Sequence, residues 1–392
     1  MSYPKKVTCP YCMESFKNPM IKDGSVNKVS QPDVCPHCKK RIPKDYFYGK
    51  VRTRYVYFIG PPSVGKTRLI GNMIMESERE FGCLDAFPDW AVSPDPDPNS
   101  DVNGNKTRDF YVQYAMDVDG SSVGSTRETQ IGRYPMVLYK LGRVDRSHGF
   151  LRSVIAPLSR TETTYLALVD AMGDWFSFKR MSANANVDPL SGAMSKEREA
   201  YRKRFAKADA VVLVMEPGHI PGLYAVDEKD ENGIPAIRQA DTGIENILLY
   251  LKMLFGSKLK KLPMAFTLSQ FDTLFSSSNV KTKDFLTDFA NGCGSRWESD
   301  TNLAHDDIDK ICSNGKALAD AILNTLLEER AKNNVREGFA AFPRSCCFAV
   351  SSTGMGGLRN ERKMLNPLHV LDPLLWIFYE WGCLGRNLFV KH

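Results

Sequence analysis

Tyr55-Val-Tyr-Phe-Ile59 is an apolar run, and Gly60-Pro-Pro-Ser-Val-Gly-Lys-Thr-Arg68 follows it directly. These fourteen residues indicate the fold class of the chain. The apolar run predicts a buried strand, and four residues separate the first glycine from Gly-Lys-Thr. A loop of this spacing between a strand and a helix turns backbone N–H groups and the positive helix end toward a phosphate. The predicted phosphate contacts are Gly60, Ser63, Val64, Gly65, Lys66, Thr67 and Arg68.

Two side chains of this loop have predicted roles of their own. Lys66 is expected to reach the β- and γ-phosphates, and the Thr67 hydroxyl is expected to hold Mg²⁺. A second apolar run, residues 165–169, reads as a buried strand and ends in Asp170-Ala-Met-Gly173. An acid at such a strand end holds the Mg²⁺ shell, and a glycine N–H there bonds the γ-phosphate. Asp170 and Gly173 are therefore predicted to complete the phosphate and magnesium site.

Two later strand ends carry candidates for base recognition. The run 264–268 leads into Ser269-Gln-Phe-Asp272, and the run 346–350 leads into Ser351-Ser-Thr-Gly354. A carboxylate at Asp272 accepts both the N1 and N2 hydrogens of guanine, an arrangement that adenine cannot satisfy. The predicted base contacts are Gln270, Asp272, Ser351 and Ser352.

Taken together, these segments resemble motifs G1, G3, G4 and G5 of the translation-factor-like and Ras-like GTPases, over about residues 51 to 385. Gln270 departs from that class, which has a lysine covering the guanine ring at this place. The closing stretch from Asn366 to Trp376 is similar to the end of the double-GTPase proteins of bacterial conflict and anti-phage systems. The resemblance implies a GTP-binding switch that needs Mg²⁺. An ATP-binding P-loop protein and a nucleotide-stabilised scaffold that does not turn over remain alternatives.

The resemblance also implies a switch I threonine and a water-positioning residue. Thr129 is the choice for switch I, where it would sense Mg²⁺ and the γ-phosphate, with Thr126 second. Asp174 stands where Ras-like enzymes carry a glutamine, and an acid there repels the γ-phosphate. Slow intrinsic hydrolysis is the consequence we expect.

Four cysteines near the start form a separate pattern. Cys9-Pro-Tyr-Cys12 and Cys35-Pro-His-Cys38 are CxxC pairs separated by 22 residues. Each pair brings two thiolates onto one turn, and two turns close a tetrahedron around zinc. A redox CxxC is the alternative, but neither pair lies between a strand and a helix. We expect a zinc ribbon over residues 1–50 with Cys9, Cys12, Cys35 and Cys38 as ligands.

Charge and composition set further limits. Residues 1–54 hold 12 Lys or Arg and 4 Asp or Glu, so 12 − 4 = +8, and the rest of the chain carries 40 − 42 = −2. The basic charge favours binding of nucleic acid phosphates or of an acidic protein partner, such as an effector or activator, and a solvated surface is the equal alternative. No apolar leader follows Met1, and the late apolar stretch 370–384 is too short to cross a bilayer. We therefore expect a cytoplasmic protein with no membrane partner.

The remaining pattern predicts the architecture. Strands are expected near 54–59, 134–141, 164–170, 210–216, 263–269 and 346–351. Helices are expected near 66–79, 195–207, 242–256, 303–333 and 367–381. This alternation indicates an α/β fold, a GTPase-like mainly parallel sheet with helices on both faces, over residues 51–392. A long insertion at about residues 80–133 interrupts it.

Overall fold

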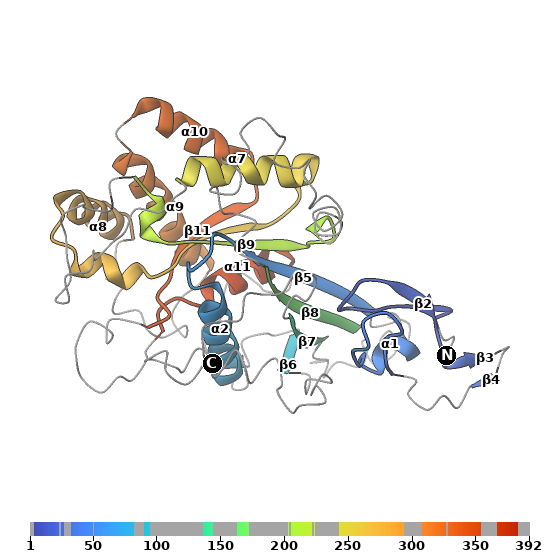
Figure 1. Cartoon of the computed structure of the whole chain (residues 1–392). Helices are drawn as coiled ribbons and strands as arrows, with labels where there is room; N and C mark the ends of the chain where they lie inside the picture. The colour runs from blue at the N-terminus through green and yellow to red at the C-terminus, as the bar shows by residue number, and fades with distance from the viewer. Residues whose placement is uncertain are drawn as a thin grey trace, which may run out of the picture.

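The computed structural model describes residues 4–22, 25–26, 33–49, 51–81, 90–94, 136–143, 163–171, 203, 205–221, 223, 243–293, 308–326, 328–353 and 367–382. Within these residues the molecule has a large sheet with helices on both faces and a small cysteine-rich unit beside it (Figure 1). No helix in the described ranges has both the length and the hydrophobicity that crossing a membrane requires.

The large sheet has the strand order β11-β10-β9-β5-β8-β7-β6. From β11 to β8, neighbouring strands are parallel, which confirms the mainly parallel prediction. The strands are β5 (Val51–Ile59), β6 (Trp90–Pro94), β7 (Met136–Arg143), β8 (Thr163–Asp170), β9 (Ala210–Met215), β10 (Met264–Leu268) and β11 (Ser345–Ala349).

Two edge strands depart from simple alternation. β7 pairs antiparallel with β8, the next strand along the chain, and β6 pairs antiparallel with β7. β6 lies inside the predicted insertion and was not expected. Antiparallel strands can be joined without a crossover helix. This side of the sheet can therefore gain strands without a helix between them.

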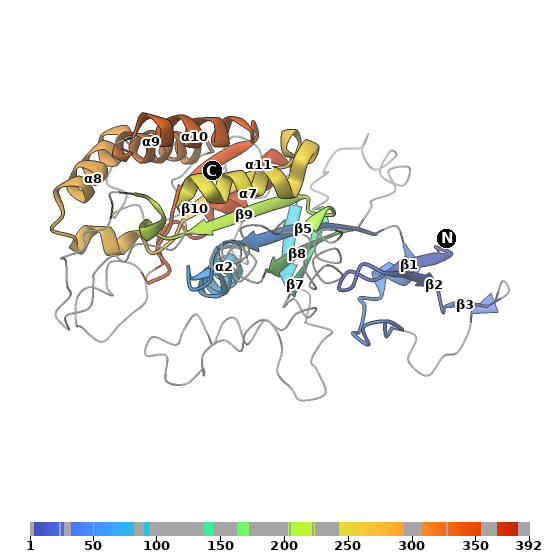
Figure 2. The same ribbon diagram turned by 45° about the horizontal axis from the view of Figure 1, so that its top comes forward.

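Helices cover the two faces unequally (Figure 2). Val56 and Phe58 of β5 share one apolar cluster with α2 (Lys66–Phe81) and α11 (Asp372–Glu380). Tyr57 and Ile59 belong to the cluster on the other face, because side chains alternate along a strand. That face carries α7 (Ile244–Phe255), α8 (Val280–Cys293) and α10 (Glu329–Ala340), and α9 (Ile308–Thr325) packs on the edge strand β11.

The single helix predicted over residues 303–333 is wrong. The chain forms α9 and α10, and it is extended at Glu328 between them. The sequence here has no proline or glycine to mark the break, because tertiary contacts cause it: α9 packs on α8 and β11, whereas α10 packs on α7. α8 was not predicted at all, and most of the predicted helix 195–207 lies outside the described residues.

The cysteine-rich unit contains strands β1 (Lys6–Thr8), β2 (Ser15–Lys17), β3 (Ile21–Lys22), β4 (Ser25–Val26) and helix α1 (Asp45–Tyr48). Tyr55 of β5 donates its hydroxyl hydrogen to the Pro10 carbonyl at 3.0 Å, and Tyr165 of β8 donates to Asp45 at 3.0 Å. The buried residues of this unit belong to the same apolar cluster as one face of the sheet. A boundary at residue 50 therefore stays a prediction, since one core crosses it.

Candidate nucleotide and metal sites

The loop after β5 has the backbone of a tight phosphate cradle. Gly60 and Gly65 have φ values of 149° and 81°, which favour glycine, and Ser63 also has a positive φ of 64°. A β-carbon at Gly60 would collide with the Val214 carbonyl of β9, so the loop lies directly against the neighbouring strand. Val64 is fully buried and fixes the middle of the loop to the core.

Lys66 begins α2 and folds back over this loop. Its Nζ donates to the carbonyl oxygens of Gly60 at 2.9 Å and Pro61 at 2.6 Å, and the residue is only 7% exposed. A buried ammonium needs such partners, because an unpaired buried charge is costly. The amine is thus already held at the loop that would enclose a phosphate.

The predicted magnesium ligands lie together. Thr67 donates its hydroxyl hydrogen to Asp170 Oδ2 at 2.9 Å, although 103 residues separate them in the chain. Asp170 is 3% exposed, at the carboxyl end of β8, which pairs with β5. A hydroxyl oxygen and a carboxylate oxygen are the hard ligands that Mg²⁺ takes beside nucleotide phosphates. These two residues fit that ion.

The predicted base-recognition residues also converge. Asp272 lies in η4 (Phe271–Ser276), just beyond β10, and is 6% exposed. Ser351 donates to one carboxylate oxygen at 2.5 Å, and Thr353 donates to the other at 3.0 Å. A carboxylate offers about four acceptor positions, so two hydroxyl bonds leave room for a ligand. The loop after β11 therefore orients Asp272.

The segment after β10 is fixed to the phosphate loop. The Ser269 hydroxyl lies 2.7 Å from the Val64 carbonyl and 2.9 Å from the Met215 carbonyl, so its single hydrogen is shared between the loop and β9. A β-carbon at Gly65 would lie 3.9 Å from the Gln270 amide nitrogen. Gln270 therefore packs on the loop from a left-handed backbone conformation. Ser269 and Thr353 were absent from the predicted site residues, although both lie in the segments that suggested it.

A further contact joins α2 to the base side. Asn72 donates to the carbonyl oxygens of Arg68 and Ser352, each at 3.1 Å. The Ser352 backbone, rather than its hydroxyl, makes this contact. Ser351 also pairs with Leu368, so the segment that leads into α11 holds the base loop from the other side.

Several predicted residues lie outside the described ranges. They are Thr129, Thr126, Gly173 and Asp174. Their roles in switch I, γ-phosphate binding and water positioning stay predictions.

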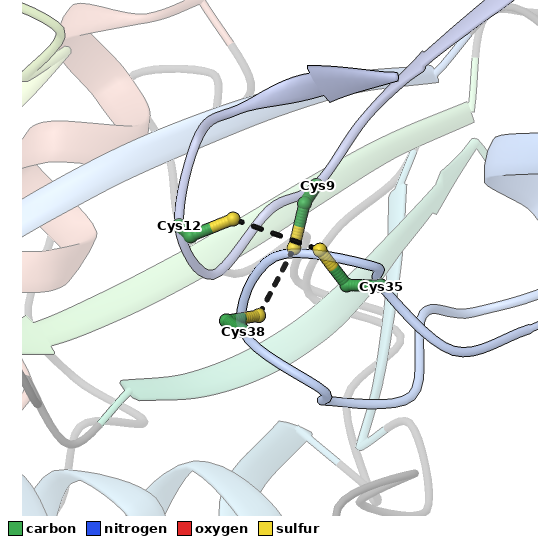
Figure 3. Close-up of side chains that lie close together, drawn as sticks. All are labelled: Cys9, Cys12, Cys35 and Cys38. Atoms are coloured by element: carbon green, nitrogen blue, oxygen red, sulfur yellow. Dashed lines mark hydrogen bonds between the residues drawn. The ribbon is translucent and has the colours of Figure 1, made fainter. Parts of the chain in front are cut away.

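The four predicted zinc ligands form one cluster (Figure 3). The Cys9 and Cys38 sulfurs are 3.7 Å apart, as are those of Cys12 and Cys35, and all four lie within 4.8 Å of one another. Zinc–sulfur bonds of about 2.3 Å in a tetrahedron set sulfur–sulfur edges of about 3.8 Å. The spacing thus fits a Cys₄ zinc site.

The two CxxC turns share one backbone pattern. Met13 N–H donates to the Cys9 carbonyl and Lys39 N–H donates to the Cys35 carbonyl. Both residues have a φ of 62°, in the left-handed region. Glycine adopts this conformation without strain, so a glycine at either position would have predicted the turn more clearly. Met13 and Lys39 are strained here, and the geometry of the CxxC turn accounts for that strain.

Protonation within the cluster already favours a thiolate. A hydrogen bond from Cys9 lowers the pKa of Cys38 to about 5, and the same bond together with burial raises the pKa of Cys9. Burial raises the pKa of Cys12 to about 11. The lowered pKa of Cys38 favours its thiolate, the form in which a cysteine binds a divalent metal.

Comparison with known proteins adds little to this geometry. No protein-family model matches the chain, and no curated protein matches it. Among solved structures, the GTPase-like domain of S. cerevisiae Ski7 bound to GTP is similar over 61% of this chain and 39% of that one. The sequence identity is 12% and the TM-score 0.24, which is too low for an argument about function.

Proposed function

We propose that this chain is a GTPase: it binds GTP with Mg²⁺, hydrolyses it slowly and acts as a molecular switch. The contact between Thr67 and Asp170, at 2.9 Å beside the buried Lys66, carries the proposal. Lys66 would meet the β- and γ-phosphates, and Thr67 with Asp170 would hold the metal that neutralises developing charge on the phosphoryl oxygens. The order of the switch segments would then depend on the γ-phosphate.

Guanine is favoured over adenine by the setting of Asp272. A buried carboxylate held by Ser351 and Thr353 is prepared to accept two further hydrogens in one plane, which guanine offers and adenine does not. Gln270 would cover the ring less tightly than a lysine. If the chain bound ATP instead, Asp272 would have no pair of base hydrogens to accept.

Binding of GTP, GDP and ATP, each measured by calorimetry with and without Mg²⁺, tests this function. We expect GTP to bind in preference to ATP and Mg²⁺ to strengthen GTP binding. Preference for ATP would support the alternative. Binding without turnover, in a phosphate-release assay, would support the scaffold.

Slow hydrolysis and the biological setting are finer parts of the proposal. Asp174 in place of a water-positioning glutamine supports slow turnover, and the likeness of residues 366–376 supports a place in a bacterial conflict or anti-phage system. Phosphate release by the isolated protein faster than about 1 s⁻¹, well above the intrinsic rate of unassisted switches, would contradict slow turnover.

The ribbon supplies a binding surface for nucleic acid. Lys6 and Lys17 are exposed cross-strand partners, and Thr8 and Ser15 pair next to them on the same face. Like charges directly opposite each other destabilise a strand pair, and a phosphate between them would remove that repulsion. The double variant Lys6→Glu/Lys17→Glu should lose salt-dependent binding of RNA or DNA.

Lys281→Glu/Lys283→Glu, which reverses two exposed lysines on α8, is the matched control for that experiment. Fluorescence anisotropy at several salt concentrations provides the measurement. If the ribbon double variant binds nucleic acid as tightly as the control double variant, the ribbon is not the nucleic-acid surface. An acidic protein is then the remaining candidate for its partner.

A further inference from the structure

His219 lies in the turn that follows β9, the strand against which the phosphate loop packs, and its described hydrogen bonds use only one ring nitrogen. This turn is η2 (Pro217–His219), and His219 ends it. β9 pairs with β5, and its last residue, Met215, is tied to the phosphate loop through Ser269. The residue is 2% exposed and is close enough to feel the charge of the Lys66 ammonium.

The ring is held at its Nδ1 atom. The Glu216 backbone N–H donates to Nδ1 at 3.2 Å, and the Glu216 carbonyl oxygen is also 3.2 Å from it. The backbone amide of Glu216 always carries a hydrogen and donates it to Nδ1. A second hydrogen on Nδ1 would point at that amide hydrogen. The neutral ring therefore carries its proton on Nε2. The hydrogen bonds among the described residues involve Nδ1 and leave Nε2–H without a protein acceptor, so this N–H is available to a ligand.

The charge state agrees with this assignment. The pKa of His219 is lowered to about 4, mainly by burial and also by the Lys66 ammonium, against the opposing effect of the Glu216 carbonyl. The ring is neutral at pH 7 and can lie near Lys66 without repelling it. A neutral imidazole N–H is a suitable donor to a phosphate oxygen.

We propose that His219 is a phosphate-binding residue, whose Nε2–H donates to an oxygen of the bound nucleoside triphosphate beside Lys66. This inference rests on the proposed function, because it needs a nucleotide in the loop. A purely structural histidine needs only Nδ1, which closes the turn. The Nε2–H, which has no acceptor among the described residues, distinguishes the two roles, since a phosphate oxygen would supply one.

Two substitutions separate the two ring nitrogens. His219→Asn keeps an acceptor where Nδ1 stands and removes the distal donor, whereas His219→Gln places an amide N–H near the position of Nε2. We expect His219→Asn to weaken GTP binding about tenfold, the effect of one lost hydrogen bond to a charged group, and His219→Gln to bind within about threefold of wild type. Ile220→Val, a change of packing at the next buried residue, should leave GTP binding unchanged.

Calorimetry with GTP and GDP identifies the phosphate concerned. A loss for GTP alone supports a γ-phosphate contact, and a loss for both supports a β-phosphate contact. Thermal melting checks that each variant folds. If His219→Asn fails to fold, NMR of the wild-type protein with ¹⁵N-labelled histidines decides. The Nε2 signal of His219 is identified as the one that is absent from His219→Gln. This signal should shift when GTP and Mg²⁺ are added.

The inference is overturned if the Asn and Gln variants bind both nucleotides as wild type does, or if that signal does not move on saturation with nucleotide. Wild-type protein that binds GTP in these experiments keeps the proposed function intact. Wild-type protein that binds neither GTP nor ATP overturns the proposed function, and this inference with it.

Discussion

At the scale of single residues, Lys66 and Asp272 mark the two ends of the proposed nucleotide. Lys66 is buried on carbonyl oxygens of its own loop, and Asp272 is buried on two hydroxyl groups. Each is a charged group that the fold has removed from water, which costs free energy unless partners or a ligand offset it. Their substitution should therefore report on binding more directly than any other change.

Lys66→Ala should weaken GTP binding by about 3 kcal/mol, roughly a hundredfold, because it removes a charge-assisted donor to the β- and γ-phosphates. The fold should persist, since the lost contacts are two hydrogen bonds within the phosphate loop and the apolar core keeps its packing. Calorimetry gives the affinity, and Lys283→Ala on the exposed face of α8 is the control. Wild-type affinity in Lys66→Ala would contradict the phosphate role.

Asp272→Asn exchanges a pair of acceptors for one acceptor and one donor. GTP binding should weaken by about 2–4 kcal/mol, and xanthosine triphosphate should bind more tightly, because it carries a carbonyl oxygen where guanine has an amino group. Competition binding of GTP, XTP and ATP measures both effects, with Asp284→Asn as an exposed control. An ATP preference in wild type and variant alike would refute guanine recognition.

The depressed pKa of His219 predicts a dependence of stability on pH. An unfolded histidine binds a proton near pH 6.5, whereas folded His219 binds one only near pH 4. The free energy of unfolding should therefore fall as pH drops from about 6.5 to 4, by about 1–3 kcal/mol, and level off below. Denaturant titrations of wild type and His219→Gln isolate this effect, because the other acid-sensitive groups are common to both.

At the scale of elements, the two CxxC turns have the same backbone conformation. Each turn includes a residue in the left-handed region that is not glycine. Met13 and Lys39 both occupy the left-handed region, at a cost of roughly 1–2 kcal/mol each. Met13 is buried and its sulfur accepts a hydrogen bond from Tyr57, whereas Lys39 is exposed. Only Lys39 can be changed without loss of packing.

Lys39→Gly should stabilise the ribbon by about 0.5–1 kcal/mol, because relief of strain exceeds the added entropy of the unfolded chain. The measurement is resistance of the N-terminal region to proteolysis as chelator concentration rises. Lys44→Gly, at an exposed residue outside the left-handed region, should have no stabilising effect. Equal protease resistance of wild type and Lys39→Gly would show that this strain is not significant.

At the scale of the whole molecule, the ribbon and the sheet are one packed body. Tyr46 and Phe47 are buried between them, and Tyr48 is 44% exposed. The first CxxC turn reaches along β5 as far as Tyr57, close to the carboxyl end of this strand, where the phosphate loop begins at Gly60. The unit that carries the cysteine cluster thus packs on the strand that leads into the phosphate loop.

Removal of zinc should therefore affect more than the ribbon. Purified protein should hold one zinc ion per chain, and Cys9→Ser or Cys35→Ser should lose it. Loss of the metal should uncover Tyr55 and Tyr57 and lower the melting temperature of the sheet by several degrees. Elemental analysis and calorimetric melting measure the two effects, with Cys293→Ser, outside the cluster, as control. An unchanged melting temperature would mean that the sheet is stable without the ribbon.

The sequence by itself determined what is local in this protein. The phosphate loop, the two CxxC turns and the apolar runs of the main strands are short patterns whose backbone needs are met within a few residues. They sufficed to predict the parallel sheet, Lys66 at its loop and the pairing of Thr67 with Asp170. The cluster of four cysteines followed in the same way, since each turn supplies its own two thiols.

Only the tertiary structure decided what depends on distant contacts. The break between α9 and α10 and the docking of the ribbon on β5 and β8 arise from packing partners far along the chain. The antiparallel edge strands arise from pairing of consecutive strands that the alternating pattern did not reveal. The contact of Asp272 with Thr353 and the effect of the Lys66 charge on the pKa of His219 also arise from partners far along the chain. No local pattern encodes them, because a side chain gains its role from neighbours that the parallel sheet brings to one edge.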